Sequence, residues 1–231
     1  MKKIGMIGGL SWQSTVDYYK VANEESNRIL GRNNTAEIIM YSVNLCEMIE
    51  YVELGELDVL ALRMCEVAVT LERAGADIIL LCTNTMHIVA SEIEAALSVP
   101  FLHIADATAA AIKAHNIKKV GLLGTPFTMN QPFYAKRLKE LHGIDVIIPN
   151  ERHHKEIYRV ITDELTFGEI SDSSRDYYLS VIEELKADGA QGIVLGCTEI
   201  PLLIKQHHTG IPVFDTAALH IKKAVKLAAG E

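Results

Sequence analysis

The sequence predicts an α/β protein built from two similar half-domains, each a parallel sheet flanked by helices. Short apolar runs rich in Ile, Val and Leu alternate with longer amphipathic segments. This alternation is typical of parallel strands that are covered by helices on both faces. Several phrases of the first half also return, in the same order, in the second half. The two halves are therefore expected to face each other.

Each expected strand is a short apolar run between turn residues, and each expected helix is a longer segment with apolar residues three and four apart. The expected strands are 3–7, 37–42, 77–82, 119–123, 145–148 and 192–195. The clearest expected helices are 58–74, 90–97, 132–141 and 173–188.

The internal repeat sets the division of the chain. Residues 2–9 (KKIGMIGG) return as 118–125 (KKVGLLGT), and residues 75–83 (GADIILLCT) return as 189–197 (GAQGIVLGC). A third echo joins VPF, which begins at Val99, to IPV, which begins at Ile211. Self-similarity at a nearly constant spacing indicates duplicated structural units. We expect residues 1–98 with 211–231 to form the first half and residues 99–210 to form the second.

Composition excludes several classes of protein. The chain has 231 residues, of which 49% are hydrophobic and 23% charged, enough for a sizeable core. Its 22 Lys and Arg against 30 Asp and Glu argue against nucleic-acid binding, which needs a basic face. The apolar runs are far shorter than the ~20 residues of a membrane helix. The four cysteines lack disulfide or zinc spacing, so we expect free thiols in the cytoplasm.

The repeat also indicates the functional residues. Ligands of such sheets bind beyond the carboxyl ends of the strands. The candidate loops are therefore 8–11 and 83–85 in the first half, and 124–128 and 197–199 in the second. The repeat superposes Thr83 on Cys197. Cys82 then matches Gly196, and we expect its side chain to point the other way and to pack.

Two reactive side chains approaching one ligand suit the inversion of a carbon stereocentre. One face of the carbon loses a proton and the other face receives one, so each face needs its own acid or base. A cysteine serves as the base once nearby donors favour its thiolate. Threonine hydroxyls and loop N–H groups would bind the substrate carboxylate and stabilise the enolate-like charge. These threonines are Thr85, Thr125, Thr128 and Thr198.

No cofactor is expected. The glycines at positions 5, 8 and 9 fail the G-x-G-x-x-G spacing of a dinucleotide site, and no pyridoxal lysine is evident. The histidine pairs 153–154 and 207–208 are expected in solvated loops and not in a metal site. His87 either orients the first candidate loop or packs a helix, and His103 is expected to be a core histidine.

These motifs resemble the aspartate/glutamate racemase family over essentially the whole chain. The matching residues are Thr83-Asn84-Thr85, Gly196-Cys197-Thr198-Glu199 and Gly124-Thr125-x-x-Thr128. The similarity is greatest to a bacterial branch that reads CTNTMH and GCTEI at these places. The resemblance implies a cofactor-independent amino-acid racemase without metal, with quasi-twofold symmetry and the active site between the halves. Relatives are commonly homodimers.

The resemblance also implies the roles of individual residues. Thr83 and Cys197 would be catalytic, with Cys197 acting on the L face. The substrate would be bound by residues from several loops and from the segment upstream of the first motif. These residues are Leu10, Ser11, Val52, Glu53, Leu54, Asn84, Thr85, Thr125, Thr128, Thr198 and Glu199.

Two departures from the family pattern shape the expected activity. Relatives usually have a cysteine at the position of Thr83, so we expect catalysis to be faster from the L-enantiomer. Members with acidic substrates carry a basic residue upstream, whereas residues 46–56 contain four glutamates and no Arg or Lys. We therefore expect neutral or broad substrate specificity. Lys155 and Arg159 are the candidates for a clamp, a basic residue that would hold the side-chain carboxylate of an acidic substrate.

Two further functions stay open on the sequence alone. Related folds use one cysteine for hydrolysis or decarboxylation, although a hydrolase would need a base beside Cys197. A catalytically idle amino-acid-binding module is also compatible with the missing first thiol.

Overall fold

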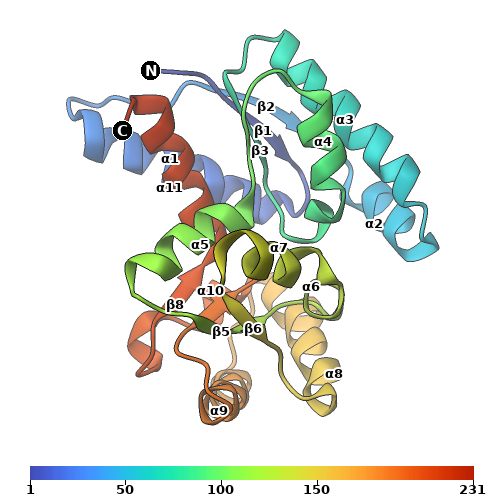
Figure 1. Cartoon of the computed structure of the whole chain (residues 1–231), viewed down its shortest axis with the longest axis vertical. Coiled ribbons are helices and arrows are strands. Elements are labelled where there is room, and N and C mark those ends of the chain that lie inside the picture. Colours follow the sequence, from blue (N-terminus) through green and yellow to red (C-terminus); the bar gives the residue numbers. More distant parts are fainter. The chain divides into compact units, whose positions relative to one another are not determined.

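Two parallel sheets of four strands each organise the chain (Figure 1). The computed structural model describes residues 1–231 and divides them into two units. Unit 1 comprises Met1–Ile104 with His220–Glu231, and unit 2 comprises Ala105–Leu219. The strand order is β2-β1-β3-β4 in unit 1 and β6-β5-β7-β8 in unit 2. The same order occurs twice, which confirms the predicted class of two similar α/β halves.

Unit 1 alternates strands and helices in the expected manner. Its elements are β1 (Ile4–Gly8), α1 (Trp12–Leu30), β2 (Ile38–Ser42), α2 (Leu45–Leu54), α3 (Leu57–Arg73), β3 (Ile78–Leu81), the 3₁₀ helix η1 (Thr85–Val89), α4 (Ala90–Ala96), β4 (Phe101–Leu102) and most of α11 (Thr216–Ala229).

Unit 2 repeats this plan with more short helices. Its elements are α5 (Ile104–Ala114), β5 (Lys119–Leu123), α6 (Pro126–Asn130), α7 (Pro132–His142), β6 (Asp145–Ile147), α8 (Glu151–Arg159), the π-helix η2 (Val160–Glu164), η3 (Leu165–Phe167), α9 (Asp172–Ala187), β7 (Ile193–Leu195), α10 (Ile200–Leu203), η4 (Gln206–His208) and β8 (Val213–Asp215).

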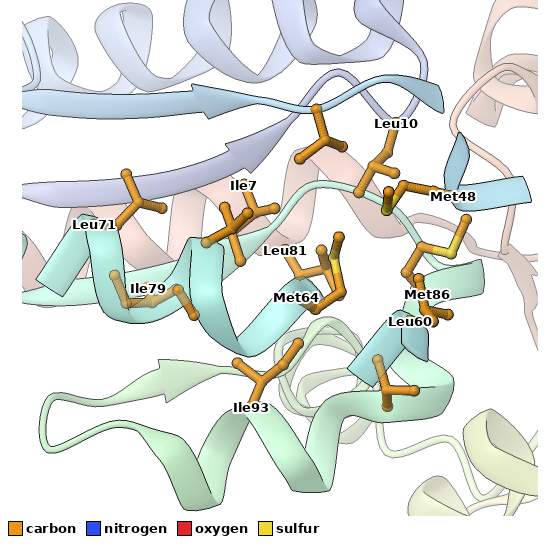
Figure 2. Packing of buried hydrophobic residues seen from close by; sticks show 14 of the residues in the cluster. Ile7, Leu10, Met48, Leu60, Met64, Leu71, Ile79, Leu81, Met86 and Ile93 are labelled. Carbon is orange, nitrogen blue, oxygen red and sulfur yellow. The ribbon is translucent and has the colours of Figure 1, made fainter. Parts of the chain in front are cut away.

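The core of unit 1 lies between its sheet and the helices that cover it (Figure 2). Ile79 and Leu81 of β3 are fully buried and face Met64 of α3 and Ile93 of α4. Burying a side chain of this size contributes about 1.5–3 kcal/mol relative to leaving it exposed. The central strands are therefore apolar at every position, as a sheet covered on both faces requires.

The repeated glycine of the two KK-x-G phrases has a packing role. A Cβ on Gly5 would lie 2.6 Å from the Cδ1 of Ile79, and a Cβ on Gly121 would lie 2.8 Å from the Cδ1 of Ile193. In both units the central strand thus has a glycine where the side chain of an isoleucine from the neighbouring strand packs over its backbone. This explains why the phrase recurs.

The expected division of the chain is corrected at both boundaries. β4 pairs in parallel with β3, and β8 pairs in parallel with β7. Residues 99–104 therefore belong to unit 1, and residues 211–219 belong to unit 2. The sequence gives no clear strand pattern at these places because β4 and β8 are only two and three residues long and mostly half-buried.

None of the helices combines the length and the apolar character needed to cross a bilayer.

Candidate active site

The pairing of central strands places Thr83 and Cys197 at equivalent positions in the two units. Ile7 of β1 is in register with Leu81 of β3, and the N–H of Cys82 then donates to the carbonyl of Ile7 at 3.0 Å. In unit 2, Leu123 is in register with Leu195, and the N–H of Gly196 donates to the carbonyl of Leu123 at 2.6 Å. Thr83 and Cys197 each follow this bond by one residue.

The same pairing separates the two candidate thiols. Cys82 is equivalent to Gly196, is 0% exposed and continues the buried strand β3. Burial raises the pKa of the Cys82 thiol far above its usual value. A buried neutral thiol at this place is a packing residue, as the repeat predicted.

Cys197 differs from Cys82 because its thiol donates a hydrogen bond to a carboxylate. The Sγ of Cys197 donates to the Oε2 of Glu199 at 3.0 Å, and the hydroxyl of Thr198 donates to the same oxygen at 2.8 Å. Glu199 is buried, while Cys197 and Thr198 are half-buried. The thiol, the hydroxyl and the carboxylate form one hydrogen-bonded group at the end of β7.

The electrostatics of this group correct one expectation. Burial, and then the charge of Glu199 and its hydrogen bond, raise the pKa of the Cys197 thiol well above its ordinary value. The backbone N–H groups of Glu199 and Thr198 act in the opposite direction but do not outweigh these effects. Cys197 therefore rests as a thiol, whereas nearby donors were expected to favour the thiolate.

Glu199 thereby supplies a hydrogen-bond acceptor for the thiol, a contact that sequence reasoning missed. Thr198 and Glu199 were predicted to bind substrate, yet their side chains bond to each other and to the thiol. The signal was present in the sequence as a carboxylate two residues after the cysteine. A turn between the two residues is needed to bring the side chains together.

In the loop after β5, the two predicted threonines are hydrogen-bonded neighbours that differ in their exposure to solvent. Thr125 caps α6 by accepting the N–H of Thr128 at 3.3 Å, and the two hydroxyls are 3.2 Å apart. Thr125 is half-buried, whereas Thr128 is 1% exposed. A Cβ on Gly124 would lie 3.2 Å from the carbonyl of Gly196, so this loop packs closely against the Cys197 loop.

In unit 1, the loop after β1 offers less side-chain chemistry than predicted. Leu10 is buried in the hydrophobic cluster, next to Met48 (Figure 2), so its side chain packs and is not available for a ligand. Ser11 caps α1 with a left-handed backbone (φ 86°), and its hydroxyl oxygen accepts the N–H of Ser14 at 3.4 Å.

The loop after β3 holds the other predicted residues of unit 1. Thr83 is 9% exposed, Asn84 is buried and Thr85 is half-buried at the start of η1. The N–H of Thr83 donates to the carbonyl of Leu81 at 2.9 Å, and its own carbonyl lies 2.7 Å from the Nδ1 of His87.

The three predicted residues of α2 do not share one face. Val52 packs against the hydrophobic cluster, Glu53 is exposed and Leu54 is 64% exposed. Consecutive side chains of a helix point about 100° apart, at 3.6 residues per turn. The structure therefore does not bring the three side chains together.

The candidate clamp Arg159 is already occupied. Its guanidinium contacts the carboxylates of Glu156 at 2.7 Å and Glu164 at 2.8 Å.

Burial, and then the nearby Cys197 and Glu164, raise the pKa of the Tyr178 hydroxyl. Cys197 and Glu164 thus lie within electrostatic reach of one buried phenol.

One histidine expectation is wrong. His153 is buried in α8, where its ring nitrogens contact Tyr177 at 2.7 Å and Glu184 at 3.0 Å. His207 and His208 lie in η4. In residues 1–231, no three His, Cys, Asp or Glu side chains gather as a metal-ligand set.

Comparisons with known proteins agree on one family. The family model described as Asp/Glu/Hydantoin racemase matches residues 7–224. The chain is 27% identical to the broad specificity amino-acid racemase RacX of Bacillus subtilis, over 96% of each chain.

Solved structures match over nearly the whole chain. A Yersinia pestis protein assigned as an Asp/Glu racemase is 48% identical, with a TM-score of 0.94 over 99% of this chain and 100% of that one. An aspartate racemase homologue from Pyrococcus horikoshii is 38% identical, with a TM-score of 0.86 over the same shares.

The contact between Cys197 and Glu199 gives a first prediction. Glu199→Gln should lower the pKa of the Cys197 thiol, because it removes the charge that disfavours the thiolate. The thiolate fraction rises as the pKa falls, at pH values below the pKa. Alkylation of Cys197 by iodoacetamide, followed by peptide mass spectrometry, should therefore become faster at about pH 8.

Glu183→Gln is the matched control, because Glu183 is an exposed glutamate of unit 2 that pairs with Lys186. An unchanged or slower reaction of Cys197 in Glu199→Gln would contradict the assignment of the carboxylate.

Proposed function

The chain belongs to the Asp/Glu/Hydantoin racemase family and is an amino-acid racemase, and we propose that Cys197 and Thr83 act on opposite faces of the substrate Cα. The observation that carries the proposal is the Cys197 thiol bonded to Glu199 at a position equivalent to Thr83. A racemase needs one proton-transfer group on each face of the carbon, and the duplicated sheet offers one such group per unit.

The proposed reaction begins from the resting thiol. Cys197 passes its proton to Glu199, and the thiolate then removes the Cα proton of the L-amino acid. The electron pair of the broken C–H bond moves onto the substrate carboxylate as enolate-like charge. Thr83, or a water that it holds, delivers a proton to the other face, and solvent restores the hydroxyl. The Cα proton stays on Cys197 as the thiol proton, and Glu199 releases the proton that it accepted to solvent, which restores the resting state. No cofactor enters these steps.

Glu199 allows Cys197 to act as a base despite the raised pKa of its thiol, because it accepts the thiol proton and leaves the thiolate. A carboxylate at hydrogen-bond distance accepts the proton without exposing the sulfur to water. The thiolate that results is a stronger base than one with an ordinary pKa. The Cα–H of an amino acid is a weak acid, so a strong base in a covered site suits the reaction.

Thr125 and the loop N–H groups are proposed to bind the substrate carboxylate. Thr125 is the accessible member of its pair, and its loop packs against the Cys197 loop. Donors in such a position stabilise the charge that develops as the proton leaves. Removal of one donor of this kind typically costs about 2.7–4 kcal/mol of barrier stabilisation.

The thiol hydrolase remains the second candidate because Glu199 supplies the base that such an enzyme needs. The two functions differ in their products. A racemase exchanges the Cα proton and releases only the enantiomer, whereas a hydrolase or decarboxylase yields a cleaved product that NMR detects in the same sample.

Cys197 is expected to be indispensable. Cys197→Ser should lower Cα deuterium exchange from L-amino acids in D₂O by at least about 10²-fold, the usual contribution of a general acid or base. Proton NMR of a panel of L-amino acids measures the exchange, and circular dichroism verifies the fold.

Cys82→Ser is the matched control because Cys82 is a buried thiol at the equivalent strand end, one residue before Thr83. It should retain exchange and lose only about 0.5–3 kcal/mol of stability. Exchange at the wild-type rate in Cys197→Ser would refute the role of Cys197.

Catalysis is expected to be asymmetric between the enantiomers. A threonine hydroxyl donates a proton but hardly accepts one, so exchange should be much faster from the L-enantiomer. The equilibrium stays near equal amounts, and the asymmetry is confined to initial rates. Thr83→Cys should raise exchange from the D-enantiomer, because a thiol is a far stronger acid than a hydroxyl and its thiolate can accept a proton from carbon.

Thr70→Cys controls for the added thiol, since Thr70 is exposed on α3. Similar initial rates from both enantiomers of the wild-type protein would overturn the asymmetric assignment.

Substrate range is expected to be neutral or broad, because two carboxylates already neutralise Arg159. Arg159→Leu and Lys155→Leu should leave the ratio of kcat/KM for L-glutamate to that for L-alanine nearly unchanged. A clamp that made a charge-assisted bond would be worth about 1.5–3 kcal/mol, or about 10–100-fold. A loss of that size confined to L-glutamate would identify the mutated residue as a clamp.

A further inference from the structure

The side chain of His87 contacts both the loop that contains Thr83 and Ile104, the first residue of α5, shortly after β4. His87 lies in η1, four residues after Thr83, and is 2% exposed. Its Nδ1 lies 2.7 Å from the carbonyl oxygen of Thr83, and the N–H of Ile104 donates to its Nε2 at 3.2 Å. One imidazole therefore contacts the backbone of both segments.

These two contacts fix the protonation state of the ring. The backbone N–H of Ile104 can only donate, so Nε2 is the acceptor and carries no proton. The carbonyl of Thr83 can only accept, so Nδ1 carries the proton and donates it. His87 is therefore a neutral imidazole in a single tautomer, and both nitrogens are engaged with the backbone.

Neighbouring rings hold the imidazole in place. The ring centroid of His87 lies 4.4 Å from that of His103, 5.7 Å from that of Phe101 and 5.9 Å from that of His220. His220 is itself bonded to the carbonyl of Leu102 at 2.7 Å and to the hydroxyl of Tyr18 at 3.0 Å. The ring of His87 thus lies in a packed aromatic cluster formed within unit 1.

Both ends of the Thr83 backbone are consequently held. Its N–H donates to the carbonyl of Leu81, and its carbonyl accepts from His87. Because the peptide bond is planar, fixing the two groups fixes the φ and ψ of Thr83. These two angles set the direction of the Cα–Cβ bond, and the hydroxyl extends from Cβ in one of the few staggered positions that a β-branched side chain allows.

The equivalent position in unit 2 has no such support. The fourth residue after Cys197 is Pro201, and the carbonyl of Cys197 instead accepts the backbone N–H of Ile200 at 3.2 Å. The histidine therefore occurs only beside Thr83, whose hydroxyl is a weaker acid than the thiol of Cys197. A hydroxyl transfers a proton to carbon only in good geometry, since its acidity gives little driving force.

We propose that His87 is a positioning residue for proton transfer on the Thr83 side. This inference rests on the proposed function, because it assumes that Thr83 delivers the second proton. His87 neither touches the substrate nor exchanges a proton with it. Its bond to the Thr83 carbonyl aims the hydroxyl, and loss of that bond affects delivery of the proton more than its removal by Cys197.

An isotope experiment separates the two half-reactions. In D₂O, the wild-type protein is given the L-amino acid that it exchanges fastest. Loss of Cα–H reports removal by Cys197, and the amount of D-enantiomer formed reports delivery from the Thr83 side. The ratio of D-product to total exchange is independent of how much enzyme is folded, so a purely structural role does not change it.

Two conservative variants separate the two contacts of the ring. His87→Asn retains a donor for the carbonyl four residues earlier, as Asn23 donates to the carbonyl of Tyr19 at 2.8 Å. His87→Gln places its amide oxygen near the position of Nε2 and retains the acceptor for Ile104. The product-to-exchange ratio should stay near wild type in His87→Asn and fall at least about tenfold in His87→Gln, within the cost of small displacements in an active site.

His115→Phe is the matched control, because His115 makes the same contact to a carbonyl four residues earlier, that of Ala111 at 3.0 Å, at an exposed place. Its ratio should equal that of the wild type. An equal fall in His87→Asn and His87→Gln, or an unchanged ratio in both, would overturn the inference.

The proposed function fails in a different way. If the wild-type protein exchanges no L-amino acid, the racemase assignment of the site is refuted. If Thr83→Val leaves the ratio unchanged, the role of Thr83 is refuted whatever the His87 variants do.

Discussion

The candidate site depends on one backbone hydrogen bond that is formed once in each unit. It connects the residue after the second central strand to the carbonyl of the first, from Cys82 to Ile7 and from Gly196 to Leu123. Parallel pairing ends at this bond, and the next residue, Thr83 or Cys197, lies at the carboxyl end of its strand, beyond which ligands of α/β proteins bind. A shift of one residue in either pairing would replace the chemical group at that edge by a packing residue. The buried apolar strands, with Gly5 and Gly121 packed against isoleucines of their neighbours, therefore fix the register that places Thr83 and Cys197 at the strand ends.

Much of the fold could be predicted because its signals are local or repeated. The central strands are continuous apolar runs, and the duplication fixed their correspondence. The boundaries could not be predicted, since β4 and β8 are defined by pairing with β3 and β7 and not by their own short sequences. His153 was misplaced for a similar reason. Its polar neighbours indicate solvent, but Tyr177 and Glu184 come from α9, a helix far along the chain.

The site was predicted by residue type better than by environment. The repeat identified Thr83 and Cys197 as equivalent, and the strand registers of both units agree with it. The sequence did not show whether donors or a carboxylate would surround the sulfur. That outcome depends on a turn that carries Glu199 back to the thiol, where its charge and its hydrogen bond add to the effect of burial in raising the pKa of Cys197. The burial of the Leu10 side chain was not evident either, because a loop position at a strand end can still send its side chain into the core.

Cys82 and Cys197 show two different environments of a thiol at the end of a central strand. Burial raises the pKa of both, and burial alone is a reason for inertness. Cys197 differs because the carboxylate of Glu199 lies at hydrogen-bond distance, and the same carboxylate that opposes ionisation also offers the proton a destination. The free energy of moving a proton between two adjacent buried groups is smaller than that of releasing it to water, since the net charge of the pair does not change. A raised pKa and the proposed role as a base are therefore compatible for Cys197, because its thiol has the carboxylate of Glu199 as a partner.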